Sequence, residues 1–214
     1  MFIIFDCDGV LVDSELISSR ELAAFLSDLG RPTSAEECRE NFTGLSLKSV
    51  SDQVRDDWGV RLPDDFITAL RIRDQAAFDR DLKAIPGVHK VLDMLDQRGL
   101  RYCVASSGSP EKIQHSLMLT NLTERFGDHV FSASNVANGK PAPDLFLWAA
   151  QTMDVVPADC VVIEDSPAGV QAAKAAGMRV LGFTGGAHCG EGYGQKLKDA
   201  DAIFDDMAAL GALL

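Results

Sequence analysis

The sequence predicts an α/β fold in which a parallel sheet is covered by helices on both faces. Short apolar runs of strand length alternate with helical patterns along most of the chain, which is typical of a parallel sheet. Residues 14–83 break this alternation, because helical patterns follow one another there with little strand. We therefore expect a core domain made of residues 1–13 plus 84–214, and a helical domain inserted into it at residues 14–83.

Apolar runs bounded by polar residues predict the strands of the sheet. The first run lies at the start of the chain, and the others follow the helical segment. The five expected strands are Phe2–Phe5, Tyr102–Ala105, His129–Phe131, Cys160–Ile163 and Arg179–Phe183.

Apolar residues at intervals of three and four predict the helices between the later strands. The clearest pattern spans Val88–Leu95, and a less regular one spans Leu145–Met153. The alanine-rich segment Pro167–Ala176 ends before Gly177, a residue that commonly terminates helices.

The inserted segment shows its own helix signals. Leu22–Leu29 carries one apolar stripe, Ser34 with Glu37 forms a capping-box pattern, and Phe66–Leu70 begins a further helix. Such a segment either simply covers the sheet or forms a cap over a cleft. Its departure just after the first strand favours a cap.

Composition restricts the class of protein. The 214 residues carry a net charge of −12, which argues against nucleic acid or an anionic membrane as a partner. The five cysteines form no C-x-x-C pair and three lie in or beside apolar runs, so we expect reduced thiols and a cytoplasmic location. No apolar run approaches the ~20 residues of a membrane span. The sequence leaves the oligomeric state open.

Glycines cluster between Gly185 and Gly194. Their spacing does not match a dinucleotide-binding fingerprint, and the helical pattern that follows is weak. We expect a mobile loop there.

Chemically active side chains follow four of the expected strands. Because parallel strands present their carboxyl ends at one edge of the sheet, we expect these side chains to meet there. They are Asp6 and Asp8 after the first strand, Ser106, Ser107, Gly108 and Ser109 after the second, Lys140 beyond the third, and Glu164 and Asp165 after the fourth.

Each of these features has a simpler explanation when it is taken alone. Asp8-Gly9 resembles a hairpin turn, Ser109-Pro110 and Ser166-Pro167 resemble helix starts, and Lys140 resembles an exposed loop lysine. Their combination has no such explanation. Four carboxylates that converge on one cleft repel each other unless a cation lies among them, and ligands that are all oxygen suit Mg²⁺.

Four segments resemble, in order, the motifs of the haloacid dehalogenase (HAD) superfamily of phosphohydrolases. They are D-C-D-G-V-L-V-D-S-E, V-A-S-S, G-K-P-A-P-D and I-E-D-S-P-A-G-V-Q-A-A-K-A-A-G-M. The resemblance implies a Rossmann-like, HAD-like core with a helical cap, in the branch that contains β-phosphoglucomutase and bacterial sugar-phosphate phosphatases. The first motif and K-I-Q-H-S-L are most similar to phosphatases that act on 6-phosphogluconate.

The resemblance also implies roles for single residues. Asp6 would be the nucleophile that forms an aspartyl-phosphate, and Asp8 the general acid. Ser106 would bond a phosphoryl oxygen, and Lys140 would offset negative charge. The Mg²⁺ ligands would be the Asp6 side chain, the Asp8 backbone carbonyl and Asp165. Glu164 would either be a further ligand or contact one of these ligands.

Substrate binding is expected from two places. The first group, Gly9, Ser107 and Gly108, would lie beneath the phosphate. The second is the loop Thr43–Lys48 of the insertion, which includes Gly44, Ser46 and Lys48. In β-phosphoglucomutase an arginine occupies the place of Leu47. Leucine holds no phosphate, so a mutase would have to use Lys48, one residue further on. Arg71 and Arg73 would either meet a substrate anion or lie on the surface.

These observations predict a Mg²⁺-dependent phosphatase of small phosphorylated metabolites, of the sugar-phosphate or phosphogluconate type, whose partner is a small-molecule phosphate ester. The first alternative is a sugar-phosphate mutase of the β-phosphoglucomutase type. A second is a non-enzymatic phospho-receiver module, although such modules carry no helical insertion after the first strand.

Overall fold

Six parallel strands form the centre of the computed structural model, which describes residues 1–214. Their order across the sheet is β3-β2-β1-β4-β5-β6, so β1 lies between β2 and β4. The predicted parallel sheet is thereby confirmed. The strands are β1 (Phe2–Phe5), β2 (Tyr102–Ser106), β3 (Val130–Ser132), β4 (Cys160–Glu164), β5 (Arg179–Phe183) and β6 (Ala202–Phe204).

The apolar runs located five of these strands to within one residue at each end. They did not predict β6, which has three residues and no strand-length apolar run around it. The structure also excludes a hairpin at Asp8-Gly9, because β1 pairs only with β2 and β4, and both pairings are parallel.

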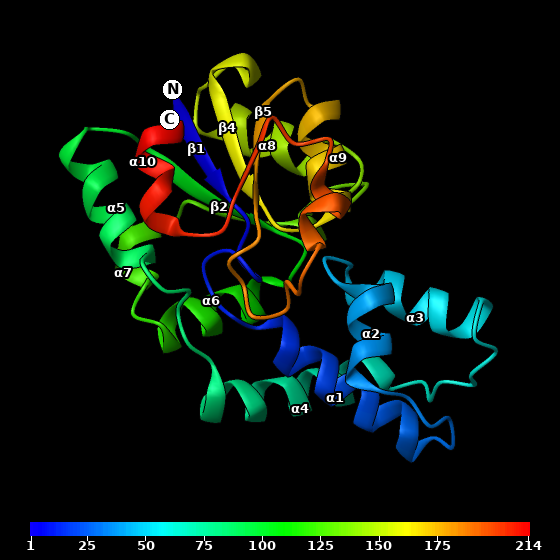
Figure 1. Ribbon diagram of the computed structural model, residues 1–214. Helices are drawn as coiled ribbons and strands as arrows, with labels where there is room; N and C mark the ends of the chain where they lie inside the picture. Colours follow the sequence, from blue (N-terminus) through cyan, green and yellow to red (C-terminus); the bar gives the residue numbers. More distant parts are fainter.

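Alternating side chains of the strands build two cores, one on each face of the sheet. In β1, Ile3 and Phe5 join the core beneath α5, α6, α7 and α10, whereas Phe2 and Ile4 join the core beneath α8 and α9. Figure 1 shows α5, α7 and α10 on one side of the sheet and α8 and α9 on the other. The bounds are α5 (Val88–Gln97), α6 (Pro110–Leu119), α7 (Thr123–Phe126), α8 (Asp144–Thr152), α9 (Pro167–Ala175) and α10 (Leu210–Leu213).

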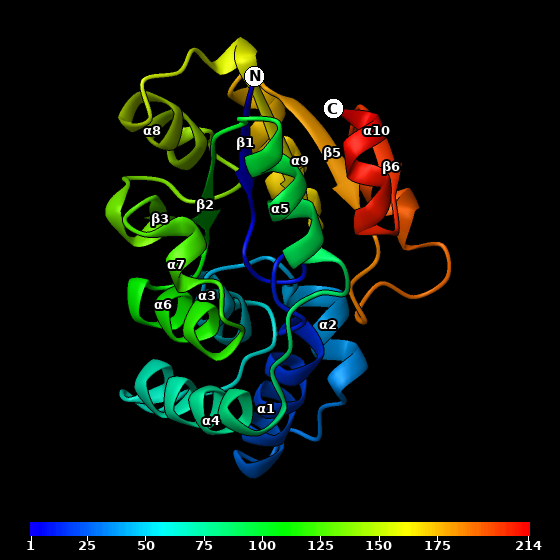
Figure 2. The same cartoon turned by 90° about the vertical axis from the view of Figure 1, so that its left-hand side faces the viewer.

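The helical insertion (residues 14–83) contains four helices and no strand: α1 (Glu15–Asp28), α2 (Ala35–Phe42), α3 (Leu47–Asp56) and α4 (Phe66–Asp81). It has a separate apolar core of 11 buried residues. Figures 1 and 2 show these helices beyond the carboxyl ends of the strands. The insertion therefore faces the edge at which we expected the chemistry.

Three helices of the insertion were predicted and α3 was not. Ser46 caps α3 by accepting a hydrogen bond from the Ser49 amide, at 3.2 Å. Leu47 and Lys48, which we expected in a loop, therefore form the first turn of this helix. Leu47, Val50 and Val54 recur at intervals of three and four along this segment, as on one face of a helix, so the signal was present in the sequence and our interpretation of Thr43–Lys48 as a loop missed it.

The two connections between the insertion and the core run side by side. Val12 and Ala84 form an antiparallel bridge, the Asp13 amide donates to the Lys83 carbonyl, and the Ile85 amide donates to the Leu11 carbonyl, both at 2.9 Å. The segment from Val10 to Val12 is fully buried, so it is part of the core.

The glycine-rich segment Gly185–Gly194 is anchored, in contrast to the mobile loop that we predicted. His188 and Tyr193 within it are buried. The Ala187 amide donates to Asp13 at 3.0 Å, and Nη1 of Arg39 in α2 donates to the His188 carbonyl at 2.5 Å. The segment thus joins the core to the insertion.

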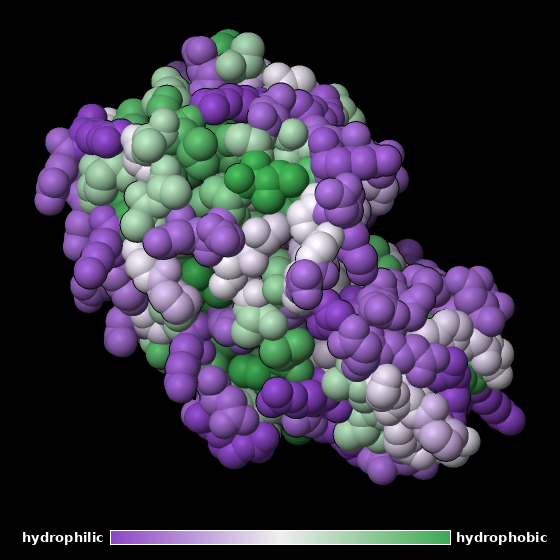
Figure 3. Space-filling view, in the orientation of Figure 1, coloured by the Kyte–Doolittle hydropathy of each residue, from purple (hydrophilic) through white to green (hydrophobic).

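Hydrophilic side chains cover most of the insertion on the face shown in Figure 3, and the surface is indented between the two parts of the molecule. None of the helices combines the length and apolar composition required to cross a bilayer.

Candidate active site

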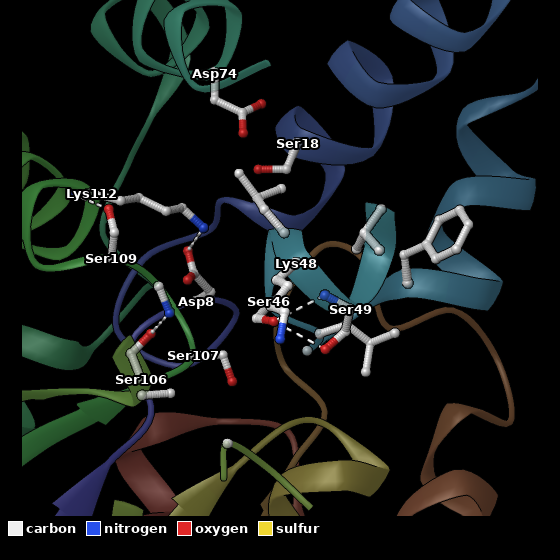
Figure 4. Close-up of a pocket in the computed structure, with 18 of the residues that line it drawn as sticks. Asp8, Ser18, Ser46, Lys48, Ser49, Asp74, Ser106, Ser107, Ser109 and Lys112 are labelled. Atoms are coloured by element: carbon white, nitrogen blue, oxygen red, sulfur yellow. Dashed lines mark hydrogen bonds and ion pairs between the residues drawn. The ribbon is translucent and has the colours of Figure 1, made fainter. Parts of the chain in front are cut away.

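A cavity of about 840 Å³ lies between the carboxyl edge of the sheet and the helical insertion. This volume is in the range of small-molecule sites. Figure 4 shows side chains from both sides facing into it. The predicted site residues that line the cavity are Asp6, Asp8, Gly44, Ser46, Lys48, Ser106, Ser107, Gly108, Lys140 and Glu164. Gly9 and Asp165 are buried and do not line it.

Asp6 and Lys140 form a buried ion pair at the floor of the cavity. The Asp6 amide continues the β1–β4 pairing by donating to the Ile163 carbonyl at 2.9 Å, which fixes the residue at the strand end. Nζ of Lys140 lies 2.5 Å from Oδ1 of Asp6 and 2.6 Å from Oε1 of Glu164. Only 2% of the Lys140 side chain is exposed. The ammonium is therefore held in one position by two carboxylates.

Burial and neighbouring charges shift the pKa values of this pair. For Asp6, burial is the largest cause and raises the pKa; Lys140 opposes it, and Glu164 and Asp165 add to it. For Lys140, burial alone would lower the pKa, but the carboxylates of Asp6 and Glu164 outweigh it and raise the pKa above its usual value. The surroundings thus favour the charged form of Lys140, whereas burial opposes the charged form of Asp6, and further positive charge nearby would favour it.

Glu164 has its side chain fixed by three groups. Oε1 accepts from Lys140, while Oε2 accepts from the Ser166 amide at 2.7 Å and from the Ser166 hydroxyl at 2.9 Å. A Cβ on Gly169, in the first turn of α9, would lie 1.8 Å from the Glu164 carboxyl carbon. These contacts direct Glu164 toward Lys140, and they give it an orienting role that the sequence left open.

Asp165 carries a buried carboxylate oxygen that receives no aligned hydrogen bond. Nε2 of His188 lies 2.9 Å from Oδ2 of Asp165, yet the geometry does not make a hydrogen bond. Burial, followed by Glu164, raises the pKa of Asp165. Sequence reasoning missed His188 because the glycines around it indicated a loop.

The acids at this edge fit a divalent cation. Oxygen atoms of Asp6, Glu164 and Asp165 lie within 4.8 Å of one another, and all three residues are buried. Opposite oxygens of a Mg²⁺ octahedron are about 4.2 Å apart. A bound cation would satisfy Oδ2 of Asp165 and offset the mutual repulsion of the carboxylates.

Gly9 leaves the space in which Asp165 and His188 lie. Its φ is +76°, and a Cβ there would be 1.8 Å from Oδ2 of Asp165. We expect Gly9→Ala to displace Asp165 and to destabilise the fold by more than about 2 kcal/mol, measured by urea denaturation. Gly59 is the matched control, because its φ is +65° and a Cβ there would meet no atom within 4 Å. If Gly9→Ala costs no more than Gly59→Ala, the close packing around Asp165 is not required.

Asp8 lies at the cavity wall with two donors on its carboxylate. Oδ1 accepts from the Ser14 hydroxyl at 2.5 Å and from Nζ of Lys112 at 2.8 Å. Burial alone would raise the pKa of Asp8, but Lys112 and Ser14 together lower it below its usual value. Asp8 is therefore ionised in this arrangement. Lys112, in the first turn of α6, was not predicted, because nothing local in the sequence connects it with a residue 104 positions away.

The loop after β2 presents the Ser106 hydroxyl to the cavity, and two hydrogen bonds fix its backbone. Oγ of Ser106 accepts from the Gly108 amide at 3.0 Å, which leaves its own proton free to donate. The Ser132 hydroxyl donates to the Gly108 carbonyl at 2.6 Å and ties the loop to the end of β3. Ser106, Ser107 and Gly108 thus line the cavity, and Figure 4 shows the two serines on the same side of it as Asp8.

Of the three expected substrate-binding residues of the insertion, two have structural roles and one is free to bind a ligand. Gly44 is required for packing, because its φ is +78° and a Cβ would lie 2.5 Å from that of Ser166 in the core. Ser46 is occupied in capping α3. Lys48 is exposed and lines the cavity, so it is free to meet a ligand.

The two arginines of α4 have different surroundings. Arg71 lines the cavity. Arg73 does not: Nη2 lies 2.8 Å from Oδ2 of Asp28, and its guanidinium lies over the ring of Phe25. Arg73 therefore packs within the insertion, as the simpler of our two explanations had it.

Comparison with known proteins agrees with this arrangement. The model of the haloacid dehalogenase-like hydrolase family matches residues 3–183. The 6-phosphogluconate phosphatase of Escherichia coli (strain K12) is 35% identical over 187 residues, which cover 87% of this chain and 83% of that protein. Hexitol phosphatase B of the same strain is 29% identical over 180 residues, covering 83% and 81%.

A solved structure is also similar over nearly the whole chain. It is a conserved haloacid dehalogenase-like protein of unknown function from Agrobacterium tumefaciens str. C58, with a TM-score of 0.85 and 36% identity, and the match covers 99% of this chain and 96% of that one. The order of the strands, the acids at their carboxyl edge and these matches lead to one conclusion: the chain belongs to the haloacid dehalogenase-like hydrolase family.

Proposed function

We propose that the chain is a Mg²⁺-dependent phosphatase that hydrolyses small phosphorylated metabolites, of the sugar-phosphate or phosphogluconate type, through an aspartyl-phosphate on Asp6. The observation that carries the proposal is the buried pair of Asp6 and Lys140, 2.5 Å apart at the floor of a large cavity. A carboxylate held beside fixed positive charge is suited to attack an anionic phosphate ester. Relatives named as phosphatases support the same class of reaction.

In the first step an oxygen of Asp6 attacks phosphorus. The new Asp6–phosphorus bond forms while the bond from phosphorus to the ester oxygen breaks, and Asp8 gives a proton to the leaving oxygen. The Ser106 hydroxyl donates to a phosphoryl oxygen, and Lys140 offsets the charge of Asp6 and the phosphoryl group. Asp8 must first gain a proton, and the negative charge of the incoming phosphate favours this by raising its pKa.

In the second step water attacks the phosphorus of the aspartyl-phosphate. Asp8, now ionised, accepts a proton from that water, the bond from Asp6 to phosphorus breaks, and inorganic phosphate leaves. The contacts of Asp8 with Lys112 and Ser14 favour the ionised form that this step requires.

The ion would be held by the side chains of Asp6 and Asp165 and by the backbone carbonyl of Asp8. When bound, Mg²⁺ supplies positive charge that draws phosphoryl oxygens and the nucleophile together. Glu164 would orient Lys140 beside it. Residues 14–83 would serve as the cap that closes over the substrate.

Hydrolysis is favoured over phosphoryl transfer between positions of a sugar. A mutase must hold a second phosphate, and α3 has Leu47 where β-phosphoglucomutase has an arginine, so only Lys48, one residue further on, offers a cation in that turn. A receiver module is disfavoured by the helical insertion and its cavity.

The test is a screen for release of inorganic phosphate from sugar phosphates, sugar-alcohol phosphates, 6-phosphogluconate and nucleotides, with MgCl₂ present. We expect turnover of at least one ester of a small metabolite. Formation of an isomer of β-glucose 1-phosphate without release of phosphate would favour the mutase instead. An acyl-phosphate that persists for minutes without turnover would favour the receiver.

Removal of the metal gives a separate prediction. In excess EDTA the rate of phosphate release should fall by at least about 100-fold and return when Mg²⁺ is restored. The reason is that the positive charge of the ion offsets the repulsion between the carboxylates of the site and the anionic substrate. Mg²⁺ alone should also raise the melting temperature of the wild type, by mass action on the folded state. Asp165→Asn should lose most of that rise. Full activity in EDTA would contradict the metal assignment.

A further inference from the structure

His188 is a buried residue beside the acids of the site that the proposed chemistry does not use. Its side chain is fully buried, and Nε2 lies 2.9 Å from Oδ2 of Asp165. Its other ring nitrogen, Nδ1, is buried without a hydrogen-bond partner. Such a nitrogen costs free energy, and an apolar side chain of similar size would avoid that cost. The presence of an imidazole therefore points to a role for its contact with Asp165.

Two glycines leave the space that the imidazole ring occupies. A Cβ on Gly9 would lie 2.8 Å from Cε1 of His188, and a Cβ on Gly186 would lie 2.7 Å from the same atom. The ring of Tyr193 packs edge-to-face with the imidazole, at 5.3 Å between ring centroids. The ring is thus fixed beside Asp165, and the glycines that we interpreted as a mobile loop serve this packing.

The proton of the neutral ring belongs on Nε2. Nδ1 has no acceptor, whereas Nε2 has the Asp165 carboxylate at 2.9 Å and Sγ of Cys189 at 3.2 Å, and the carboxylate is the stronger acceptor of the two. Burial is the largest influence on the pKa of His188 and lowers it, which favours the uncharged ring. An uncharged N–H dipole restrains the carboxylate without adding a positive charge that would repel a bound cation.

The insertion fixes the backbone of His188. Nη1 of Arg39 in α2 donates to the His188 carbonyl at 2.5 Å, and Arg39 is also paired with Glu36, three residues earlier in the same helix. The neighbouring amide of Ala187 donates to the carboxylate of Asp13, where the chain leaves the core, at 3.0 Å. Figure 1 shows this segment in orange, reaching from the sheet toward the insertion.

Asp165 connects the same segment to the acids at the carboxyl edge of the sheet. One of its oxygens lies within 4.8 Å of oxygens of Asp6 and Glu164. Groups that contact a metal-ligating carboxylate fix its orientation, and their loss typically weakens metal binding by about 10- to 100-fold. A series of contacts therefore runs from Arg39 in the insertion, through His188, to a carboxylate that would hold the ion.

We propose that His188 is a positioning residue for Asp165 and that Arg39 holds His188 in place, so that full affinity for Mg²⁺ requires the insertion to be docked on the segment Gly185–Gly194. The proposal rests on the proposed Mg²⁺-dependent function and adds a link between the ion and the insertion. Because such a link is reciprocal, the bound ion favours the docked insertion by the same factor.

The experiment measures the binding of Mg²⁺ alone, without substrate, from the rise of the melting temperature with the concentration of MgCl₂. In His188→Leu, which has no donor, the Kd for Mg²⁺ should rise by about 10- to 100-fold. His188→Gln keeps an N–H donor on a side chain of similar length, so it should recover most of the lost affinity. A residue that only fills space would not show this recovery.

Arg39→Met tests the link to the insertion. It should raise the Kd for Mg²⁺ by about 3- to 10-fold, because the imidazole stays but its backbone loses an anchor. The matched control is Arg55→Met. Arg55 lies on α3 and likewise pairs with an acid three residues earlier, Asp52, but its other hydrogen bond is to Asp56 and not to the glycine-rich segment. This control should leave the Kd unchanged.

Melting temperatures in EDTA give the stability of each variant without the ion, so that only the further rise with MgCl₂ reports binding. An unchanged Kd in His188→Leu, an equal Kd in His188→Gln and His188→Leu, or an equal Kd in Arg39→Met and Arg55→Met would overturn the proposal. If His188→Leu does not fold, the comparison of the two arginine variants decides.

These results are distinct from a failure of the proposed function. A wild type whose melting temperature does not respond to MgCl₂, and whose phosphate release is the same in EDTA, would remove the metal-dependent function itself. A wild type that binds Mg²⁺ as tightly as its His188 and Arg39 variants would leave that function standing and remove only the link to the insertion.

Discussion

Asp6→Asn is expected to lower kcat for phosphate release by about 10⁴-fold or more, because an amide oxygen is a poor nucleophile and the covalent step is lost. The measurement is steady-state release of phosphate, together with acid quenching of a ³²P-labelled substrate. Protein-bound phosphate should be trapped on the wild type and be absent from the variant.

The stability of Asp6→Asn provides its control. Burial raises the pKa of Asp6, so the folded state holds the ionised carboxylate at a cost in free energy, and a neutral amide removes that cost. Lys140 keeps Glu164 as a partner at 2.6 Å. In EDTA the variant should therefore melt no lower than the wild type. A variant that is well folded and retains wild-type turnover would exclude Asp6 as nucleophile.

Lys140→Met should have the second largest effect, on both activity and stability. Loss of one fixed positive charge at the reacting group is worth about 10²–10³-fold in kcat. The variant also leaves Asp6 and Glu164 facing each other in a buried site, which costs about 3–5 kcal/mol of folding free energy when one partner of a buried pair is removed. Steady-state kinetics and urea denaturation measure the two effects.

A double variant separates these effects. Lys140→Met with Glu164→Gln removes the charge that Lys140 neutralised, so it should recover part of the lost stability without recovering kcat. Lys174→Met is the matched control: it breaks an exposed pair with Asp201 and should change stability little. A change confined to KM in Lys140→Met would count against a role in stabilising charge during the reaction.

Much of the site could be predicted from the sequence because its side chains follow the strands of a parallel sheet. Asp6, Ser106 and Glu164 each lie at the carboxyl end of a strand that its apolar run located to within one residue. A parallel sheet brings such ends to one edge, so the meeting of the acids with Lys140 followed from topology. The chemical roles of these residues stay predictions.

The residues that were missed depend on packing between distant segments. Lys112 reaches Asp8 from the first turn of a helix, His188 reaches Asp165 from a glycine-rich segment, and Arg39 reaches the His188 carbonyl from α2 of the insertion. None of them lies directly at a strand end, since His188 comes five residues after β5 and Lys112 six residues after β2, and none has a local pattern that marks it. Their positions depend on how the insertion and the last loop pack over the edge of the sheet.

The adjacent connections at Val12 and Ala84 have an evolutionary consequence. Because the chain leaves and re-enters the core at nearly one point, the length of what is inserted between them places no strain on the sheet. The segment between them can therefore change in length or sequence while the strand ends that carry Asp6, Ser106 and Glu164 keep their positions.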